Sequence, residues 1–131
     1  MPFGDTTSEE IERVAREIVD AAFKVHKALG PGLLESCYKV LMIYELRKRG
    51  LRVDVELPVP IYYDGIKFET GYRFDLLVED LVIVEMKSVV EMIPLYKAQT
   101  LTYLRLLNKR LGLLINFNVE LIKEGIKRVI L

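Results

Sequence analysis

The stretch that most constrains the fold is Tyr72 to Ser88, which reads YRFDLLVEDLVIVEMKS. Its two apolar runs are separated by Glu79-Asp80, which predicts two antiparallel strands joined by a tight turn. Asp75 lies in the first run, and the second run ends in Glu85-Met86-Lys87. A charged side chain on such an apolar strand is costly unless it is paired or binds a metal ion. The hairpin therefore predicts either a metal site or a buried ion pair.

The expected register brings the charged residues of this hairpin together. Side chains two apart on a strand point the same way, so Glu85 and Lys87 project together above Ile83. A turn centred on Glu79-Asp80 places Asp75 opposite Glu85. Two carboxylates with backbone and water oxygens suit Mg²⁺, and Lys87 could orient the attacking water or stabilise developing charge. From the residues alone, an Asp75–Lys87 or Glu85–Lys87 ion pair that holds the hairpin explains the pattern equally well.

The composition is that of one soluble domain spanning residues 1–131, with residues 1–7 expected to form a flexible N-terminal segment. No apolar run approaches the roughly 20 residues that a membrane span needs. The polar, acidic start is unlike a signal peptide. Cys37 is the single cysteine, which favours a reducing cytoplasm, and its helical setting predicts a small core residue. The formal net charge of +0 lowers the expectation of tight non-specific nucleic-acid binding.

Two helices are expected before the hairpin. Residues 7–29 repeat apolar side chains at helical spacing, with Thr7 and Glu10 as a capping box. His26 lies in the last turn, where a dipole or packing role competes with a role in an active site. Residues 33–49 predict a second helix, in which Glu35 occupies the first turn. Its basic end, 47–49, suits a helix C-terminus, with a phosphate-contacting patch as the alternative. The buried side is expected to contain Leu34, Cys37, Leu41 and Tyr44, with Tyr38 alongside.

The remaining segments predict strands and one further helix. Residues 51–63 alternate loosely as a strand that breaks or lies at an edge near Pro58 and Pro60. Asp64-Gly65 predicts a hairpin whose second strand runs through Gly71 into the Asp75 segment, giving a meander of antiparallel strands.

A third helix is expected from Pro94 to near Asn108. On this helix Gln99 and Tyr103 share a face with Tyr96. Strands at 112–117 and 126–131 complete the chain.

These motifs together resemble the PD-(D/E)XK nuclease superfamily. The resemblance rests on Asp75 followed by Glu85-x-Lys87, an upstream helical Glu35 and a downstream Gln99-xxx-Tyr103. More closely, residues 32–38 (GLLESCY) are similar to the motif of the small GxxExxY proteins placed in that superfamily. Segments around His26, at 71–75 and at 113–117 also fit that family, although Phe74 stands where the superfamily label has proline.

The expected elements follow one another in the order α-α-β-β-β-α-β-β. The resemblance implies that they form an α/β, restriction-endonuclease-like fold, with a mixed central sheet flanked by helices. It implies that Asp75 and Glu85 bind the metal, that Lys87 is catalytic, and that Glu35 is an ancillary acid at the metal. Gln99 is implied to support catalysis, and His26 and Tyr103 are implied as further ancillary residues.

The implied function is a Mg²⁺- or Mn²⁺-dependent nuclease that hydrolyses phosphodiester bonds of DNA or RNA in the cytoplasm. The alternative is a non-catalytic nucleic-acid- or protein-binding module that retains the nuclease fold. Small nucleases often need two copies to cut two strands, so a homodimer fits this interpretation. No membrane partner is expected.

Overall fold

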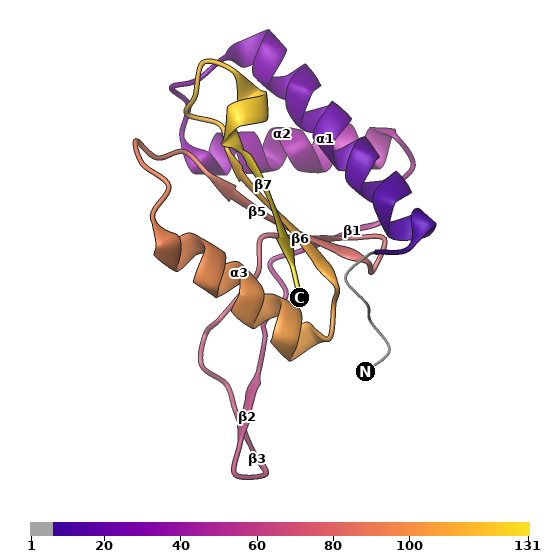
Figure 1. Ribbon diagram of the computed structural model, residues 1–131, viewed down its shortest axis with the longest axis vertical. Coiled ribbons are helices and arrows are strands. Elements are labelled where there is room, and N and C mark those ends of the chain that lie inside the picture. The colour runs from indigo at the N-terminus through magenta and orange to yellow at the C-terminus, as the bar shows by residue number, and fades with distance from the viewer. Residues whose placement is uncertain (1–6) are drawn as a thin grey trace.

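A five-stranded mixed sheet lies at the centre of the protein (Figure 1). The computed structural model describes residues 7–131, so the predicted flexible segment 1–7 falls outside the description except for Thr7. The sheet has the order β1-β4-β5-β6-β7, in which only β5 and β6 run parallel. The expected mixed sheet flanked by helices is confirmed. The elements are α1 (Glu9–Leu29), α2 (Glu35–Lys48), β1 (Val53–Val55), β2 (Ile61–Tyr63), β3 (Ile66–Phe68), β4 (Leu76–Val78), β5 (Val82–Lys87), α3 (Pro94–Leu107), β6 (Leu111–Asn116), the 3₁₀ helix η1 (Ile122–Gly125) and β7 (Ile126–Ile130).

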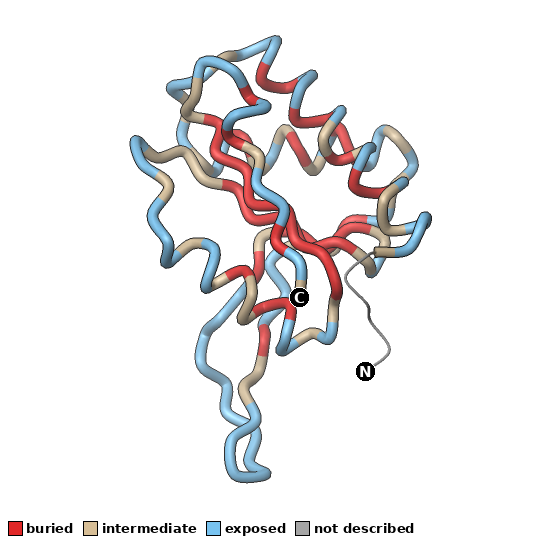
Figure 2. The backbone as a smooth tube through the Cα atoms, in the orientation of Figure 1, coloured by how far each residue is buried: buried red, intermediate tan, exposed pale blue. Residues whose placement is uncertain are grey.

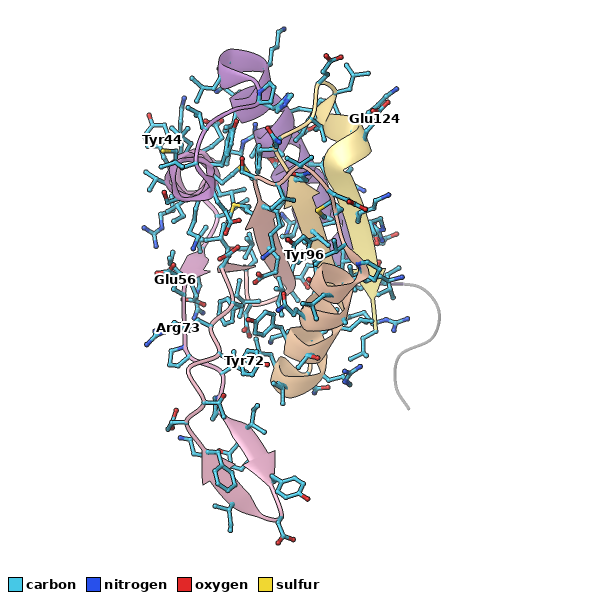
Figure 3. All side chains as sticks on the ribbon, turned by 90° about the vertical axis from the view of Figure 1, so that its left-hand side faces the viewer. Tyr44, Glu56, Tyr72, Arg73, Tyr96 and Glu124 are labelled. Atoms are coloured by element: carbon cyan, nitrogen blue, oxygen red, sulfur yellow. The ribbon has the colours of Figure 1, made fainter. Side chains whose placement is uncertain are left out.

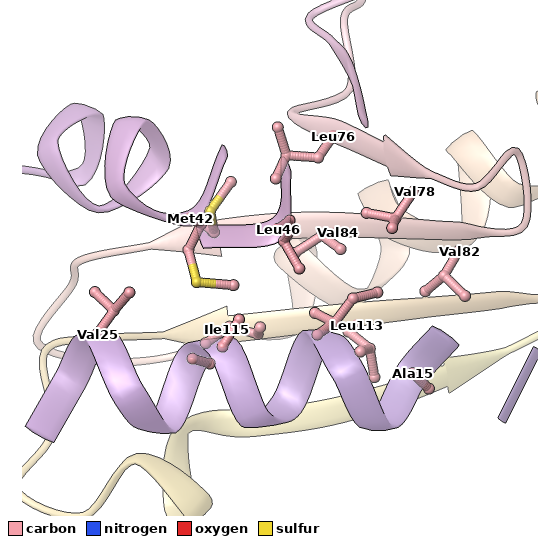
Figure 4. Close-up of a cluster of buried hydrophobic side chains, with 14 of the residues drawn as sticks. Ala15, Val25, Met42, Leu46, Leu76, Val78, Val82, Val84, Leu113 and Ile115 are labelled. Atoms are coloured by element: carbon pink, nitrogen blue, oxygen red, sulfur yellow. The ribbon is translucent and has the colours of Figure 1, made fainter. Parts of the chain in front are cut away.

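Helices cover both faces of the sheet and divide the core in two. Helices α1 and α2 lie on one face and α3 lies on the other (Figure 1). The backbone of the central strands is buried, whereas the outer turns of the helices are exposed (Figure 2). The larger cluster packs between the sheet and α1–α2 (Figure 4) and includes Ala15, Val25, Met42, Leu46, Leu76, Val82, Val84 and Leu113. The smaller cluster lies under α3 and includes Phe74, Leu77, Ile83, Tyr103, Leu104 and Leu114.

Helix α1 starts later than the capping-box prediction. Ser8 is the N-cap, and its Oγ accepts a hydrogen bond from the N–H of Ile11 at 3.2 Å. The Thr7 hydroxyl instead donates to the Glu12 carboxylate. The predicted pairing of Thr7 with Glu10 is therefore wrong, because the helix begins at Glu9 and shifts each cap position by one.

The buried face of α2 differs from the prediction. Leu34 is 73% exposed, Tyr44 is 63% exposed and Cys37 is exposed, so none of these is a core residue. Tyr38 is buried as expected, and Leu41 packs partly buried against the core, whereas the other buried residues of α2 are Met42, Glu45 and Leu46.

Two contacts explain why α2 buries a different side from the one that its apolar residues predict. The Tyr38 ring stacks on Phe117, with ring centroids 4.5 Å apart, and so fixes which side of α2 meets the sheet. Buried Glu45 lies 3.1 Å from Lys24 and 3.5 Å from Arg49, whereas a pattern of hydrophobicity assigns a glutamate to solvent.

The basic end of α2 is engaged within the chain. Arg47 donates to the Val53 carbonyl at 2.9 Å, and Arg49 lies 3.1 Å from the Glu17 carboxylate. The Lys48 ammonium lies 5.9 Å from the centroid of the Tyr44 ring on the same helix. These contacts agree with the helix-end interpretation of residues 47–49.

The strand predicted over residues 51–63 is two separate strands. β1 joins the central sheet, whereas β2 pairs with β3 in a hairpin that projects from the body of the protein (Figure 1). Glu56 has a left-handed φ of 49°, and Pro58 and Pro60 lack the N–H that a continuous strand needs. The hairpin turn at Asp64-Gly65 is confirmed, with φ of 57° and 75°.

The expected continuous strand into Asp75 is also interrupted, because β3 ends at Phe68 and β4 begins at Leu76. Five strands rather than three therefore lie between α2 and α3. The third helix and the last two strands are confirmed as α3, β6 and β7, and Asn108 ends α3 with a left-handed φ of 54°. Over residues 7–131, no helix has both the length and the apolar character needed to cross a membrane.

Candidate active site

The two predicted metal-binding carboxylates lie against each other at the end of the β4–β5 hairpin. Leu76 pairs with Val84, so Asp75, which precedes β4, stands opposite Glu85 as the sequence predicts. The N–H of Asp75 donates to Glu85 Oε1 at 2.8 Å, and the N–H of Met86 donates to Asp75 Oδ2 at 2.8 Å. These reciprocal bonds hold each carboxylate against the backbone of the facing segment.

Glu85 is the more deeply buried of the two carboxylates. Glu85 is only 8% exposed, so its charge is poorly solvated. Burial and then the nearby charge of Asp75 raise the pKa of Glu85 to about 8, although the Asp75 N–H and the cations of Lys87 and Lys39 oppose this. The two carboxylates supply hard oxygen ligands, and a bound divalent cation would offset the repulsion between their negative charges. The residues present therefore fit a metal ion bound by Asp75 and Glu85.

Lys39 is a site residue that the sequence interpretation missed. It projects from α2, and its Nζ lies 3.0 Å from Asp75 Oδ1 and 2.7 Å from Glu56 Oε1. Burial lowers the pKa of Lys39, but its hydrogen bonds to Glu56 and Asp75 and their charges outweigh that effect and raise the pKa overall. The sequence feature that could have indicated Lys39 is its position four residues after Glu35, which puts both side chains on the same side of one helix.

Lys87 points to the α3 face of the sheet together with Glu85, as predicted from their spacing. Its Nζ lies 4.6 Å from the centroid of the Tyr96 ring, a cation–π distance. Among residues 7–131, the structure records no salt bridge between Lys87 and a carboxylate, and the ion-pair partner of Asp75 is Lys39. The alternative in which Lys87 itself pairs with Asp75 or Glu85 is therefore wrong in that form.

One face of α3 borders the two carboxylates. Tyr96, half-buried Gln99 and buried Tyr103 follow one another at helical spacing on it. Burial, followed by the charges of Glu85 and Asp75 and the neighbouring Tyr72, raises the pKa of Tyr103 to about 12, so its hydroxyl keeps its proton. Tyr72 meets the Tyr103 ring edge-on, with centroids 6.1 Å apart, in the space between the stem of the β2–β3 hairpin and α3 (Figure 3).

Glu35 is half-buried in the first turn of α2. Within residues 7–131, no three acidic, histidine or cysteine side chains group closely enough to hold a metal ion, so Glu35 does not complete a three-acid cluster with Asp75 and Glu85. The segment before it is nevertheless tied to the site, because Ser88 Oγ donates to the Leu33 carbonyl at 2.7 Å. The predicted metal role of Glu35 stays a prediction.

Tyr38, the last residue of the GLLESCY motif, fixes the loop before α2. Its hydroxyl donates to the Gly30 carbonyl at 2.5 Å and accepts from the N–H of Leu33 at 3.2 Å. With its ring stacked on Phe117, it orients the turn that carries Glu35.

His26 is buried on α1, and its Nε2 lies 2.7 Å from the Val119 carbonyl, to which it can donate. This bond supports the packing interpretation of His26. Its ancillary role at the active site stays a prediction.

A family model of the PD-(D/E)XK nuclease superfamily matches residues 12–129. The chain belongs to this superfamily. Neither the curated proteins nor the solved structures compared with the chain gave a match. For this PD-(D/E)XK protein, the assignment of Asp75 and Glu85 as the acids of the superfamily label, and of Lys87 as its lysine, stays a prediction.

Proposed function

We propose that this PD-(D/E)XK protein is a nuclease that hydrolyses phosphodiester bonds of DNA or RNA with Mg²⁺ or Mn²⁺. The observation that carries the proposal is that Asp75 donates its N–H to the Glu85 carboxylate and accepts from the Met86 N–H, with Lys87 extending from the same strand as Glu85. This arrangement gathers the parts that phosphodiester hydrolysis needs: oxygen ligands for a cation and an ammonium group beside them.

Asp75 and Glu85 would hold the ion, with water and backbone oxygens completing its surroundings. A divalent cation bound there supplies Lewis-acid stabilisation of the phosphate and lowers the pKa of a bound water. Lys87 orients the attacking water or stabilises the charge that develops on the phosphate. Its place over the Tyr96 ring limits where the ammonium can go, and Gln99 offers an amide for a further hydrogen bond on the same side.

The chain also fits the GxxExxY branch of the superfamily, in which Glu35 would be an ancillary acid at the metal. Glu35 is one turn before Lys39 on α2, and Lys39 contacts Asp75, which supports a place for Glu35 at the edge of the site. The interpretation of a cytoplasmic protein that cuts two strands as a homodimer is part of the same proposal.

Cleavage assays on single- and double-stranded DNA and RNA, with Mg²⁺ or Mn²⁺, test the proposal. We expect Lys87→Ala and Asp75→Ala each to lower the cleavage rate by about 100-fold or more. Lys109→Ala is the matched control, because Lys109 pairs with Asp80 at the turn of the same hairpin, 3.0 Å away. Equal cleavage by the wild type and Lys87→Ala, or cleavage of no substrate, contradicts the proposal.

The alternative is a binding module that retains the fold. It is favoured by the observation that Lys39 already neutralises Asp75 within the chain. Saturable nucleic-acid or protein binding, unchanged by chelation or by Asp75→Ala and without cleavage, would establish it instead of the enzyme.

A further inference from the structure

Lys39 occupies the place where a cation is needed. Asp75 Oδ2 accepts from the Met86 N–H, so Oδ1 is the oxygen that remains, and the Lys39 ammonium lies 3.0 Å from it. Both side chains are mostly shielded, with 17% of Lys39 and 15% of Asp75 exposed, so water screens their attraction only in part. An ion that binds Asp75 Oδ1 must displace this ammonium or share the oxygen with it.

Glu56 is a second carboxylate that holds the same ammonium at the same time as Asp75. Its Oε1 lies 2.7 Å from Lys39 Nζ, and its side chain is 54% exposed, so it is far more open to solvent than Asp75. The Glu56 N–H donates to the Asp75 carbonyl at 3.0 Å, which fixes the distance between the two carboxylate-bearing residues. Glu56 and Arg73 lie together on the α2 side of the hairpin stem (Figure 3). A lysine has a flexible four-carbon stem and can shift between two such neighbours.

We propose that Lys39 is a built-in counter-ion that competes with the divalent cation for Asp75, and that Glu56 receives the lysine when the metal binds. The inference rests on the proposed metal site, and it goes further by assigning the control of metal affinity to two residues on α2 and after β1. In the metal-free protein, the Lys39 ammonium thus offsets part of the negative charge of the two acids. The same contact sets how much free cation the site needs.

The test is a comparison of Mg²⁺ and Mn²⁺ affinities by titration calorimetry at fixed ionic strength, with the ion-induced shift in melting temperature as a second readout. We expect Lys39→Met to bind Mg²⁺ about tenfold more tightly than the wild type, because the competing charge is gone. We expect Glu56→Gln to bind it more weakly, by about threefold, because Lys39 then has Asp75 as its remaining partner. Lys109→Met removes the same charge from an ion pair at the turn and should leave the affinity unchanged within about twofold.

The double variant Lys39→Met with Glu56→Gln separates competition from long-range charge effects. If Glu56 acts through Lys39, the effect of Glu56→Gln should shrink once Lys39 is absent. Glu56 is largely exposed, so Glu56→Gln keeps the inference testable even if Lys39→Met does not fold. Lys39→Gln gives a second neutral side chain at that position.

The outcomes distinguish the two proposals. Unchanged or weaker Mg²⁺ binding by Lys39→Met, in a protein whose binding is abolished by Asp75→Ala, overturns the role of Lys39 and leaves the metal site intact. If neither the wild type nor any variant binds Mg²⁺ or Mn²⁺, the proposed metal site is wrong, and so is the proposed competition. Additive effects of the two substitutions would overturn the assigned role of Glu56.

Discussion

Asp75 and Glu85 hold each other through the backbone: the Asp75 N–H donates to Glu85 Oε1 at 2.8 Å, while Asp75 Oδ2 accepts from the residue after Glu85. The bonds hold the Glu85 carboxylate beside Asp75 in a buried position, where burial and the charge of Asp75 raise the pKa of Glu85. The hairpin is therefore shaped for chemistry at some cost to its stability without metal.

The stability of the metal-free protein should fall as the pH rises. Burial and the charge of Asp75 raise the pKa of Glu85 from 4.5 to about 8, so the folded state holds this proton more tightly than the unfolded state does. The resulting stabilisation is present below about pH 4.5 and is lost as the pH rises through about 8. Chemical denaturation of the wild type and of Glu85→Gln, each across this range, measures it. Relative to the variant, the wild type should lose on the order of 5 kcal/mol; parallel pH profiles would contradict the prediction.

Metal affinity should rise with pH over the same range. Because Glu85 must release its proton to act as an anionic ligand, Mg²⁺ binding should tighten until the pH passes about 8 and then level off. Calorimetry in two buffers with different ionisation enthalpies should detect close to one proton released per ion at pH 6 to 7, as an order-of-magnitude expectation. Heats that do not depend on the buffer would show that Glu85 is already ionised.

His26→Ala should destabilise the fold without altering metal affinity. The substitution removes the bond from Nε2 to the Val119 carbonyl and leaves a cavity beside a buried residue, at a cost of about 2 kcal/mol. Phe23→Ala is the control, since Phe23 lies one turn earlier on α1 and is 43% exposed, and its cost should be smaller. A loss of Mg²⁺ binding at full stability would instead give His26 the ancillary role that the family resemblance implies.

Gly112→Ala should push α3 away from the sheet. A Cβ at position 112 would lie 2.7 Å from Thr100 Cγ2, so we expect a loss of about 1–3 kcal/mol in unfolding free energy. Cleavage should fall as well, because α3 carries Tyr96 and Gln99. Thr100→Ser removes that methyl group and keeps a hydroxyl for the 3.0 Å bond to the Tyr96 carbonyl, so the double variant should recover most of the loss. Equal stability of the single and double variants would show that the strain lies elsewhere.

Local signals in the sequence predicted the parts of the fold that depend on neighbouring residues. The turn at Glu79-Asp80 fixed the register that sets Asp75 against Glu85, and Pro94 marked the start of α3. The Asp64-Gly65 turn could also be predicted, because Asp and Gly favour the left-handed backbone conformation that both turn positions adopt.

Contacts between distant segments decided what the sequence pattern missed. The rotation of α2 depends on the stacking of Tyr38 against Phe117, so apolar spacing within the helix could not reveal it. Lys39 meets Asp75 only after α2 has packed beside the end of β4, and Lys39 alone resembles any helix-surface lysine. The sequence motif therefore gave the acids and the lysine on the hairpin, and the fold supplied their counter-ion.

The exposure of Cys37 has a practical consequence for following this site. It is the single cysteine of the chain, and it lies midway between Glu35 and Lys39 on α2. A thiol-reactive fluorophore or spin label would therefore attach at one position, on the turn of α2 that precedes Lys39 but on the other side of the helix, with no engineered residue. The wild-type protein thus offers its own position for a reporter of the proposed ion and nucleic-acid binding.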